Sequence, residues 1–187
     1  MLSAALAAGA LFGWAIDRAG LDWQPSRFAA EPWRAWSAAF VHLSPLHLGA
    51  NLVGLALVAA LGTAVPLPRR CALAWFIAWP LTQAGLLFQP ALGHYGGLSG
   101  VLHAGVAVAV VHLLCRGTPV QRRIGLAMFV VLCLKLLHEA PWDAVVRHPS
   151  GWDIAVTPGA HLSGALAGAL CAAAAEGPWR ACPPIKR

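Results

Sequence analysis

Apolar residues fill six long stretches of this chain, and short polar connections separate them. The stretches cover about residues 1–16, 44–66, 71–91, 98–115, 122–138 and 159–175. Each is close in length to the roughly 20 residues that a helix needs to cross a bilayer. We therefore predict an all-α polytopic membrane protein, with six transmembrane helices in a single domain over residues 1–187.

The first stretch, residues 1–16, allows a second interpretation. It is short and rich in alanine, which also fits a cleaved signal peptide. No basic segment precedes the apolar residues, although a signal peptide would begin with one. We expect this stretch to be retained as a helix of the bundle.

Composition supports a lipid environment. Hydrophobic residues make up 59% of the chain and charged residues 11%, with a mean hydropathy of +0.67. Soluble domains carry about 25% charged residues. The net charge of +6 does not indicate nucleic-acid binding, because the basic residues form small clusters instead of a stripe interleaved with aromatic residues. The five cysteines show no CxxC spacing and predict neither a disulfide framework nor a zinc site.

The basic clusters predict how the chain crosses the membrane. Eight basic residues lie in alternate connections, namely Arg69, Arg70, Arg116, Arg122, Arg123, Arg180, Lys186 and Arg187. The other connections hold four, namely Arg18, Arg27, Arg34 and Arg147. Since cytoplasmic loops are enriched in Lys and Arg, both termini are expected in the cytoplasm. Connections 17–43, 92–97 and 139–158 then face outward.

The first outward connection, residues 17–43, is long and aromatic. Its aromatic residues include Trp23, Phe28, Trp33, Trp36 and Phe40. Tryptophan and tyrosine are enriched at the level of the lipid headgroups. We expect this connection to lie in the membrane interface.

Polar side chains gather at the outer ends of three spans that all run inward. They are His42, His47 and Asn51 on the second span, Ser99 and His103 on the fourth, and His161 on the sixth. Polar and ionisable groups inside a membrane are costly, so each is a functional candidate. Their shared depth predicts one site near the outer face.

Ser99 has the sequence environment of a nucleophile. It lies between Gly97 and Gly100, and glycines allow a sharp turn and close approach of a substrate chain. At a helix N-terminus, free N–H groups and the positive end of the dipole can stabilise an oxyanion. An ordinary helix-capping serine in a glycine-rich loop is the competing interpretation.

His161 precedes a Gly-x-x-x-Gly pair formed by Gly164 and Gly168. This spacing lets two helices approach to backbone contact, and it could bring the imidazole to Ser99. The alternative is that the glycines only pack helices and that His161 is an interfacial histidine.

His47 and Asn51 are four residues apart and share a helix face. An imidazole and an amide can both donate hydrogen bonds to an oxyanion, whereas Asn is a poor ligand for transition metals. We predict no metal site, and the chain contains no HExxH motif. A polar cluster that only holds helices together would give the same spacing.

Taken together, these motifs resemble the rhomboid family of intramembrane serine proteases. The matching segments are Trp33-Arg34, His42-x4-His47-x3-Asn51, Gly97-x-Ser99-Gly100 and Ala160-His161-x2-Gly164-x3-Gly168. Their order and their places on alternate spans also match. The resemblance implies a rhomboid-like six-helix bundle and cleavage of peptide bonds inside the membrane.

The resemblance also implies a role for each residue. Ser99 would be the nucleophile and His161 the general base and acid. His47 and Asn51 would form the oxyanion hole with the Ser99 N–H. The structural residues would be Trp33, Arg34, His42, Gly97, Gly100, Gly164 and Gly168.

One position departs from the family pattern. The family often has Tyr four residues after the serine, where its ring stacks on the catalytic histidine, and this chain has His103. His103 could position His161 or act as a rival base, since it shares a helix face with Ser99. No span supplies an obvious acid to orient His161, so we expect a Ser–His dyad without a carboxylate.

Within the family, Gly97–His103 and the Lys135-x3-Glu139 pair resemble the bacterial rhombosortase branch. This implies transmembrane protein substrates with a C-terminal Gly-Gly anchor, cut on the periplasmic side of the inner membrane. No cofactor is expected, and a monomer suffices for the site. Lys135 and Glu139 also fit a plain i,i+4 ion pair.

Two other function classes remain open. The chain could be an inactive rhomboid-like protein that binds membrane clients. It could also be a haem or quinone protein that uses some of its eight histidines, although paired ligands should then face each other at mid-membrane.

Overall fold

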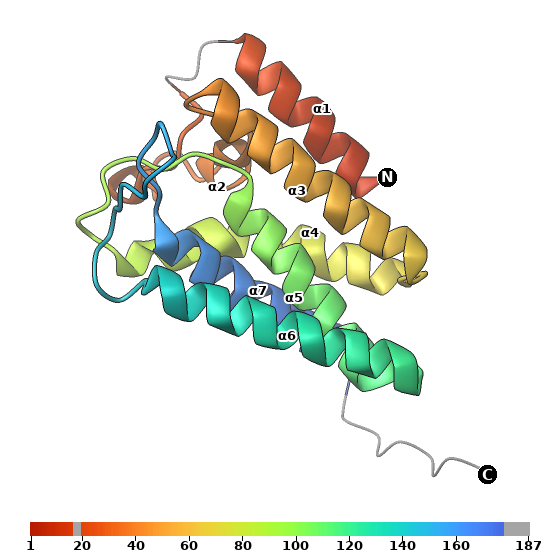
Figure 1. Ribbon diagram of the computed structural model, residues 1–187. Helices are drawn as coiled ribbons and strands as arrows, with labels where there is room; N and C mark the ends of the chain where they lie inside the picture. The colour runs from red at the N-terminus through yellow and green to blue at the C-terminus, as the bar shows by residue number, and fades with distance from the viewer. Residues whose placement is uncertain (17–19, 178–187) are drawn as a thin grey trace, which may run out of the picture.

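The computed structural model describes residues 1–16 and 20–177, which are helical apart from loops and two isolated β-bridges. The α-helices are α1 (Leu2–Ala15), α2 (Arg34–Ser37), α3 (Pro45–Ala64), α4 (Arg69–Ala84), α5 (Ser99–Arg116), α6 (Pro119–Glu139) and α7 (Pro158–Glu176) (Figure 1). Short 3-10 turns cover Pro25–Arg27, Ala38–Phe40 and Gly85–Phe88. The all-α prediction is confirmed. Arg18, Arg180, Cys182, Lys186 and Arg187 lie outside the described residues.

Each predicted apolar stretch contains one long helix, and local sequence explains where several begin. Ser44 caps α3 by accepting the His47 N–H at 3.0 Å, and Pro45 occupies the first turn. Thr118 and Gln121 form a capping box at the start of α6. The four-residue helix α2 was not predicted, because it is too short to show a helical period.

Three of the described helical segments are long and apolar enough to cross a membrane: Pro45–Ala64, Arg69–Phe88 and Ser99–Arg116. The shorter α1 is also apolar. These segments support a membrane protein. The count of six spans stays a prediction.

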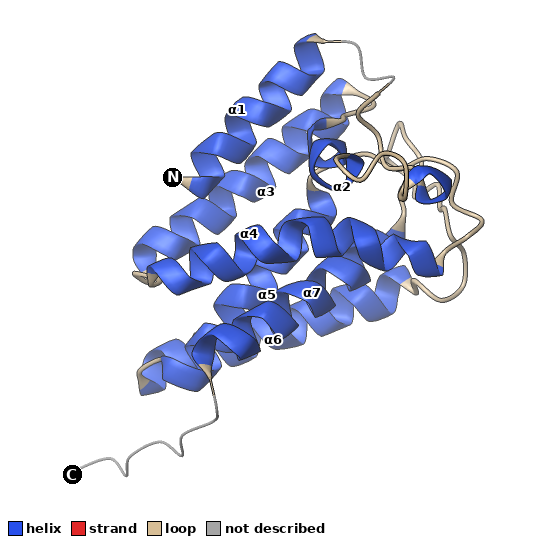
Figure 2. Cartoon of the chain, turned by 180° about the vertical axis from the view of Figure 1, so that it is seen from behind, coloured by secondary structure: helices blue, strands red, loops and turns tan. Residues whose placement is uncertain are grey.

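The bundle is organised around α5, which packs most extensively against α7. A Cβ added at Gly164 would lie 2.0 Å from the carbonyl oxygen of Gly100, and one at Gly168 would lie 2.2 Å from that of Ala104. The two backbones therefore touch, as the Gly-x-x-x-Gly spacing predicts. Both views show α3, α5 and α7 starting at the end of the molecule that carries the loops (Figures 1 and 2).

A buried acid joins three helices at the opposite end. The Glu176 side chain, at the end of α7, is 4% exposed. It accepts from Arg70 Nε of α4 at 3.2 Å and from Arg116 Nε of α5 at 3.0 Å. His112 Nδ1 of α5 lies 2.6 Å from Glu176 Oε1. One carboxylate thus ties α4, α5 and α7 together.

Replacing this acid should weaken the bundle. Glu176→Ala removes the carboxylate that accepts from Arg70 and Arg116 and, among the described residues, leaves Arg116 with only the backbone oxygen of residue 176. We expect a loss of about 2–3 kcal/mol in the free energy of unfolding. The loss stays below that of a fully buried pair because both arginines are partly exposed. Unfolding in detergent measures it. Arg69→Ala, which removes an exposed charge at the same end, should change stability little, and equal stability of both variants would contradict the prediction.

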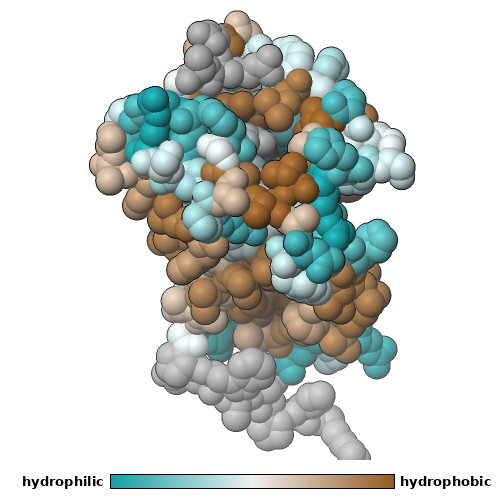
Figure 3. All heavy atoms as spheres, turned by 90° about the vertical axis from the view of Figure 1, so that its left-hand side faces the viewer, coloured by the Kyte–Doolittle hydropathy of each residue, from teal (hydrophilic) through white to brown (hydrophobic). Residues whose placement is uncertain are grey.

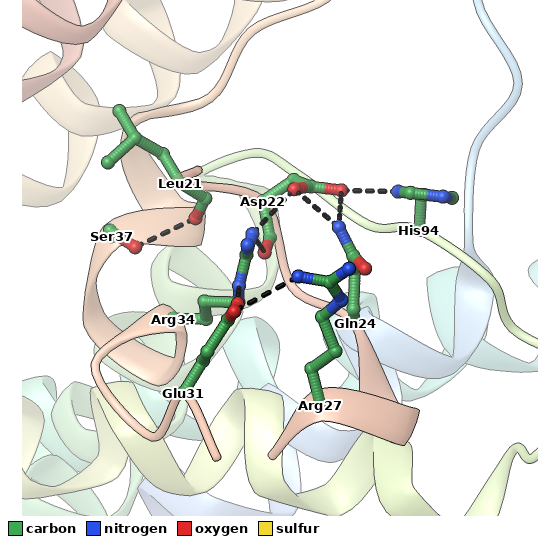
Figure 4. Close-up of polar contacts among 8 residues, drawn as sticks. All are labelled: Leu21, Asp22, Gln24, Arg27, Glu31, Arg34, Ser37 and His94. Carbon is green, nitrogen blue, oxygen red and sulfur yellow. Dashed lines mark hydrogen bonds and ion pairs between the residues drawn. The ribbon is translucent and has the colours of Figure 1, made fainter. Parts of the chain in front are cut away.

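Arg34 joins segments of the connection between α1 and α3 (Figure 4). Its side chain is 4% exposed and donates to the Asp22 backbone oxygen at 2.9 Å, to Asp22 Oδ1 at 2.8 Å and to Glu31 Oε2. The Arg34 guanidinium holds the pKa of the Glu31 carboxyl below its usual range. These contacts are those of a residue that supports the loop.

The aromatic residues of this connection do not all face the membrane interface. Trp33 is 53% exposed, as expected for a headgroup contact. Trp23 is fully buried instead, and its backbone pairs with Tyr95 through an isolated β-bridge. The interface prediction is therefore wrong for Trp23, because the connection folds back over the helix ends.

Candidate active site

Ser99 is the first residue of α5, and the loop before it is held in place by backbone geometry. Gly97 has a φ of 134°, which disfavours any residue with a side chain. The Gly97 N–H donates to the Ala38 carbonyl at 2.9 Å. Tyr95 donates its hydroxyl to the Gly97 carbonyl at 3.3 Å, and burial raises the pKa of Tyr95, so the phenol stays protonated.

His161, in the first turn of α7, contacts the serine directly. Its Nε2 lies 3.0 Å from Ser99 Oγ. Its Nδ1 lies 2.7 Å from Glu139 Oε2. A carboxylate only accepts, so Nδ1 carries a proton and Nε2 of the neutral ring can accept from Ser99. This is the arrangement a general base requires.

Glu139 is the residue that sequence reasoning missed. The expectation that no carboxylate orients His161 is wrong, because α6 ends beside α7 and places Glu139 against the ring. Lys135 contacts the same carboxylate, as the i,i+4 spacing predicts. One indication was available in the sequence, since Glu139 directly follows the fifth predicted stretch, at the depth predicted for Ser99 and His161.

His103 lies over His161. The two rings stack with their centroids 4.2 Å apart and their planes 12° from parallel. His103 Nδ1 donates to the Ser99 carbonyl, 2.7 Å away. The ring therefore takes the stacking place that the family gives to Tyr, and its Nδ1 points at backbone rather than at Ser99 Oγ.

His47 and Asn51 flank the space in front of Gly97. A Cβ at Gly97 would lie 2.7 Å from His47 Nε2 and 3.8 Å from Asn51 Nδ2. His47 Nδ1 accepts the Leu43 N–H at 3.3 Å, so the proton of the neutral ring is on Nε2. Asn51 Nδ2 is buried and has no hydrogen-bond partner among the described residues. Two donors thus face one small space.

A cavity of about 750 Å³ opens beside these residues, between α3, α5 and α6. Ser99, His161 and Glu139 line its polar end, and apolar side chains such as Leu57, Val58, Val131 and Leu132 line the rest. Figure 3 views the loop end, where hydrophilic residues flank an area of hydrophobic ones. The cavity suits an apolar chain that presents one polar bond to Ser99.

Two groups of side chains have the ligand types of a metal site. They are His103, Glu139 and His161, and Cys71, His112 and Glu176. In each group the carboxylate already contacts cationic side chains, Lys135 in the first and Arg70 and Arg116 in the second. These charges offset that of the carboxylate and disfavour a bound cation.

The structure brings Ser99, His161, His47, Asn51 and His103 together, as the shared depth predicts. Gly97 faces His47 and Asn51, Gly100 packs against the backbone of Ala160 in α7, and Gly164 and Gly168 contact α5. The remaining predicted residues lie apart from the serine. His42 is fully buried, with its ring 4.9 Å from that of His47, while Arg34 and Trp33 belong to the outer connection.

Comparison with known proteins agrees with this arrangement. A family model described as the Rhomboid domain matches residues 29–176, which is more than half of the chain. Curated protein sequences give no significant match.

Proposed function

The chain belongs to the rhomboid family, and we propose that it is an intramembrane serine endopeptidase in which Ser99 and His161 carry out the reaction. The observation that carries this proposal is the 3.0 Å contact between Ser99 Oγ and His161 Nε2. A serine that only caps a helix and a histidine that only lies at the membrane interface would not require this hydrogen-bond contact.

The proposed reaction follows the geometry. His161 Nε2 takes the Ser99 proton as Ser99 Oγ attacks the scissile carbonyl. The developing oxyanion lies near Gly97, where His47 Nε2 and Asn51 Nδ2 can donate to it. His161 then protonates the leaving amine, and a water activated by the same nitrogen releases the acyl group from Ser99.

We propose transmembrane proteins with a C-terminal Gly-Gly anchor as substrates, cut on the periplasmic side of a bacterial inner membrane. The resemblance of the Gly97–His103 segment to rhombosortases supports this class. The apolar walls of the cavity also suit a membrane-embedded segment. Both termini would be cytoplasmic, and one copy would suffice for the site.

The substrate proposal is tested by locating the new C-terminus of a Gly-Gly reporter by mass spectrometry. Cleavage beside the Gly-Gly segment with the wild type, and none with Ser99→Ala, is the expected result. Replacing the two reporter glycines by leucine provides the control. Equal cleavage of both reporters would contradict the Gly-Gly specificity but leave the protease proposal intact.

The alternative function is that of an inactive rhomboid-like protein that binds membrane clients. A fluorophosphonate probe reacts with an activated serine, so it should label the wild type and fail to label Ser99→Ala. A wild-type protein that is folded and remains unlabelled would favour the inactive alternative.

Asn51 should contribute to the rate without being essential. We expect Asn51→Ala to lower kcat by about 10²–10³-fold with little change in KM, because one oxyanion donor is lost. Steady-state cleavage in detergent measures both constants. Val53→Ala, on an exposed position of the same helix, serves as the control. A matching loss in that variant would mean that the helix, and not the amide, causes the effect.

A further inference from the structure

Glu139 and His161 form a contact that the family resemblance does not imply. The resemblance gives a serine and a histidine without an acid, yet Glu139 Oε2 lies 2.7 Å from His161 Nδ1. The Glu139 side chain is 19% exposed and that of His161 is 11% exposed. A hydrogen bond between two part-buried groups is screened less by water than one on the open surface.

From this contact we infer that Glu139 is a positioning residue and that the site works as a Ser99–His161–Glu139 triad. The inference rests on the proposed function. Glu139 accepts the Nδ1 proton, which fixes the ring and leaves Nε2 free to receive the Ser99 proton. When His161 becomes protonated during the reaction, the carboxylate stabilises the positive charge.

The carboxylate is itself held in place. Lys135 contacts its Oε1 atom while His161 contacts Oε2, so each oxygen has a donor from a different direction. Ala140, directly after Glu139, has a φ of 41°, and its N–H donates to the Leu136 and Leu137 carbonyls. A non-glycine residue keeps this conformation only where the surroundings impose it. These local hydrogen bonds fix the conformation of the chain where α6 ends, directly after Glu139.

His103 also contacts the His161 ring. It stacks on one face of His161, and its Nδ1 proton is used by the Ser99 carbonyl. Stacking sets the tilt of the His161 plane, whereas among the described residues Glu139 alone contacts its Nδ1. The tautomer therefore depends on Glu139.

Glu139→Gln is the sharpest variant, because it keeps the size of the side chain. The Lys135 ammonium can only donate, so it takes the amide oxygen and turns the amide NH2 toward His161. Nδ1 must then accept, and the proton moves to Nε2, where the ring cannot act as a base toward Ser99. We expect kcat to fall about 10²–10⁴-fold with KM nearly unchanged.

The pH profile separates this role from a structural one. Among the described residues, the titratable groups that interact with His161 or Glu139 include Lys135, His103 and His47, and all three remain in the variant. Without the carboxylate the protonated imidazole is less stable, so the acidic limb of the kcat/KM profile should move to lower pH in Glu139→Ala. A loss of packing alone would lower activity at all pH values equally.

The test measures kcat, KM, the pH profile and the unfolding midpoint of wild type, Glu139→Gln, Glu139→Ala and Asp143→Asn. Asp143 is an exposed acid in the loop that follows α6, and its replacement should give wild-type values. Near wild-type kcat in a folded Glu139→Gln protein would overturn the triad. Since that result leaves the wild type active and dependent on Ser99, it would not affect the proposed function. Activity that persists in Ser99→Ala would overturn the function itself.

Discussion

Ser99→Ala is expected to reduce cleavage of a membrane-anchored reporter to background, a loss of at least about 10⁴-fold in kcat. The reason is that Ser99 Oγ is the atom 3.0 Å from His161 Nε2, and alanine offers no nucleophile. The fold should be retained, because alanine is well tolerated at the start of a helix interior. Cleavage in detergent or proteoliposomes, with the unfolding midpoint measured alongside, provides the readout.

Ser163→Ala is the matched control for this prediction. Ser163 lies two residues after His161 and donates to the Thr82 carbonyl at 2.7 Å, away from the cavity. It should therefore leave cleavage largely intact. Normal cleavage by Ser99→Ala would eliminate the serine mechanism.

Two further variants distinguish His161 from His103 as the base for Ser99. His161→Ala should be inactive, since no other base among the described residues contacts Ser99 Oγ. His103→Tyr should keep much of its activity, because a tyrosine ring can stack on His161 in the same place. Loss of activity in His103→Tyr with retention in His161→Ala would reverse the assignment.

The arrangement of Ser99, His161, His47 and Asn51 could be predicted from sequence because it depends on the depth of each residue along its predicted span. Apolar length determines where each helix meets the interface, and helix direction determines which end carries the polar residues. Residues at the start of α3, α5 and α7 must then lie at one face of the bundle. Glycines at 164 and 168 add the close approach of α7 to α5.

Depth gives the level of Glu139 in the sequence pattern but does not predict its contact with His161, and it does not place Trp23. Glu139 had a sufficient local partner in Lys135, and its contact with His161 depends on how the end of α6 lies against α7. Trp23 fits the rule for interfacial aromatic residues, but its β-bridge with Tyr95 joins segments distant in sequence. In both cases the deciding contact is long-range, and periodicity and composition carry no information about it.

Gly164→Val should have the largest effect on stability. Even a Cβ at this position would lie 2.0 Å from the Gly100 carbonyl oxygen, and backbone cannot move aside as a side chain can. We expect a loss of about 3 kcal/mol or more, because α7 must separate from α5. The same movement would draw His161 away from Ser99, so activity should fall even where the protein still folds. Unfolding in detergent and reporter cleavage measure the two effects.

Gly49→Ala is the matched control for this prediction. Gly49 lies within α3, and no heavy atom outside its local helix lies within 4 Å of an added Cβ. Alanine there should leave activity intact and raise stability by roughly 0.5–1 kcal/mol, since glycine is the poorer helix former. Comparing the stabilities of the two variants separates the effect of backbone contact from that of helix propensity. A Gly164→Val protein as stable as Gly49→Ala would mean that α5 and α7 do not touch at Gly100, and the 3.0 Å contact between Ser99 and His161 would lose its structural basis.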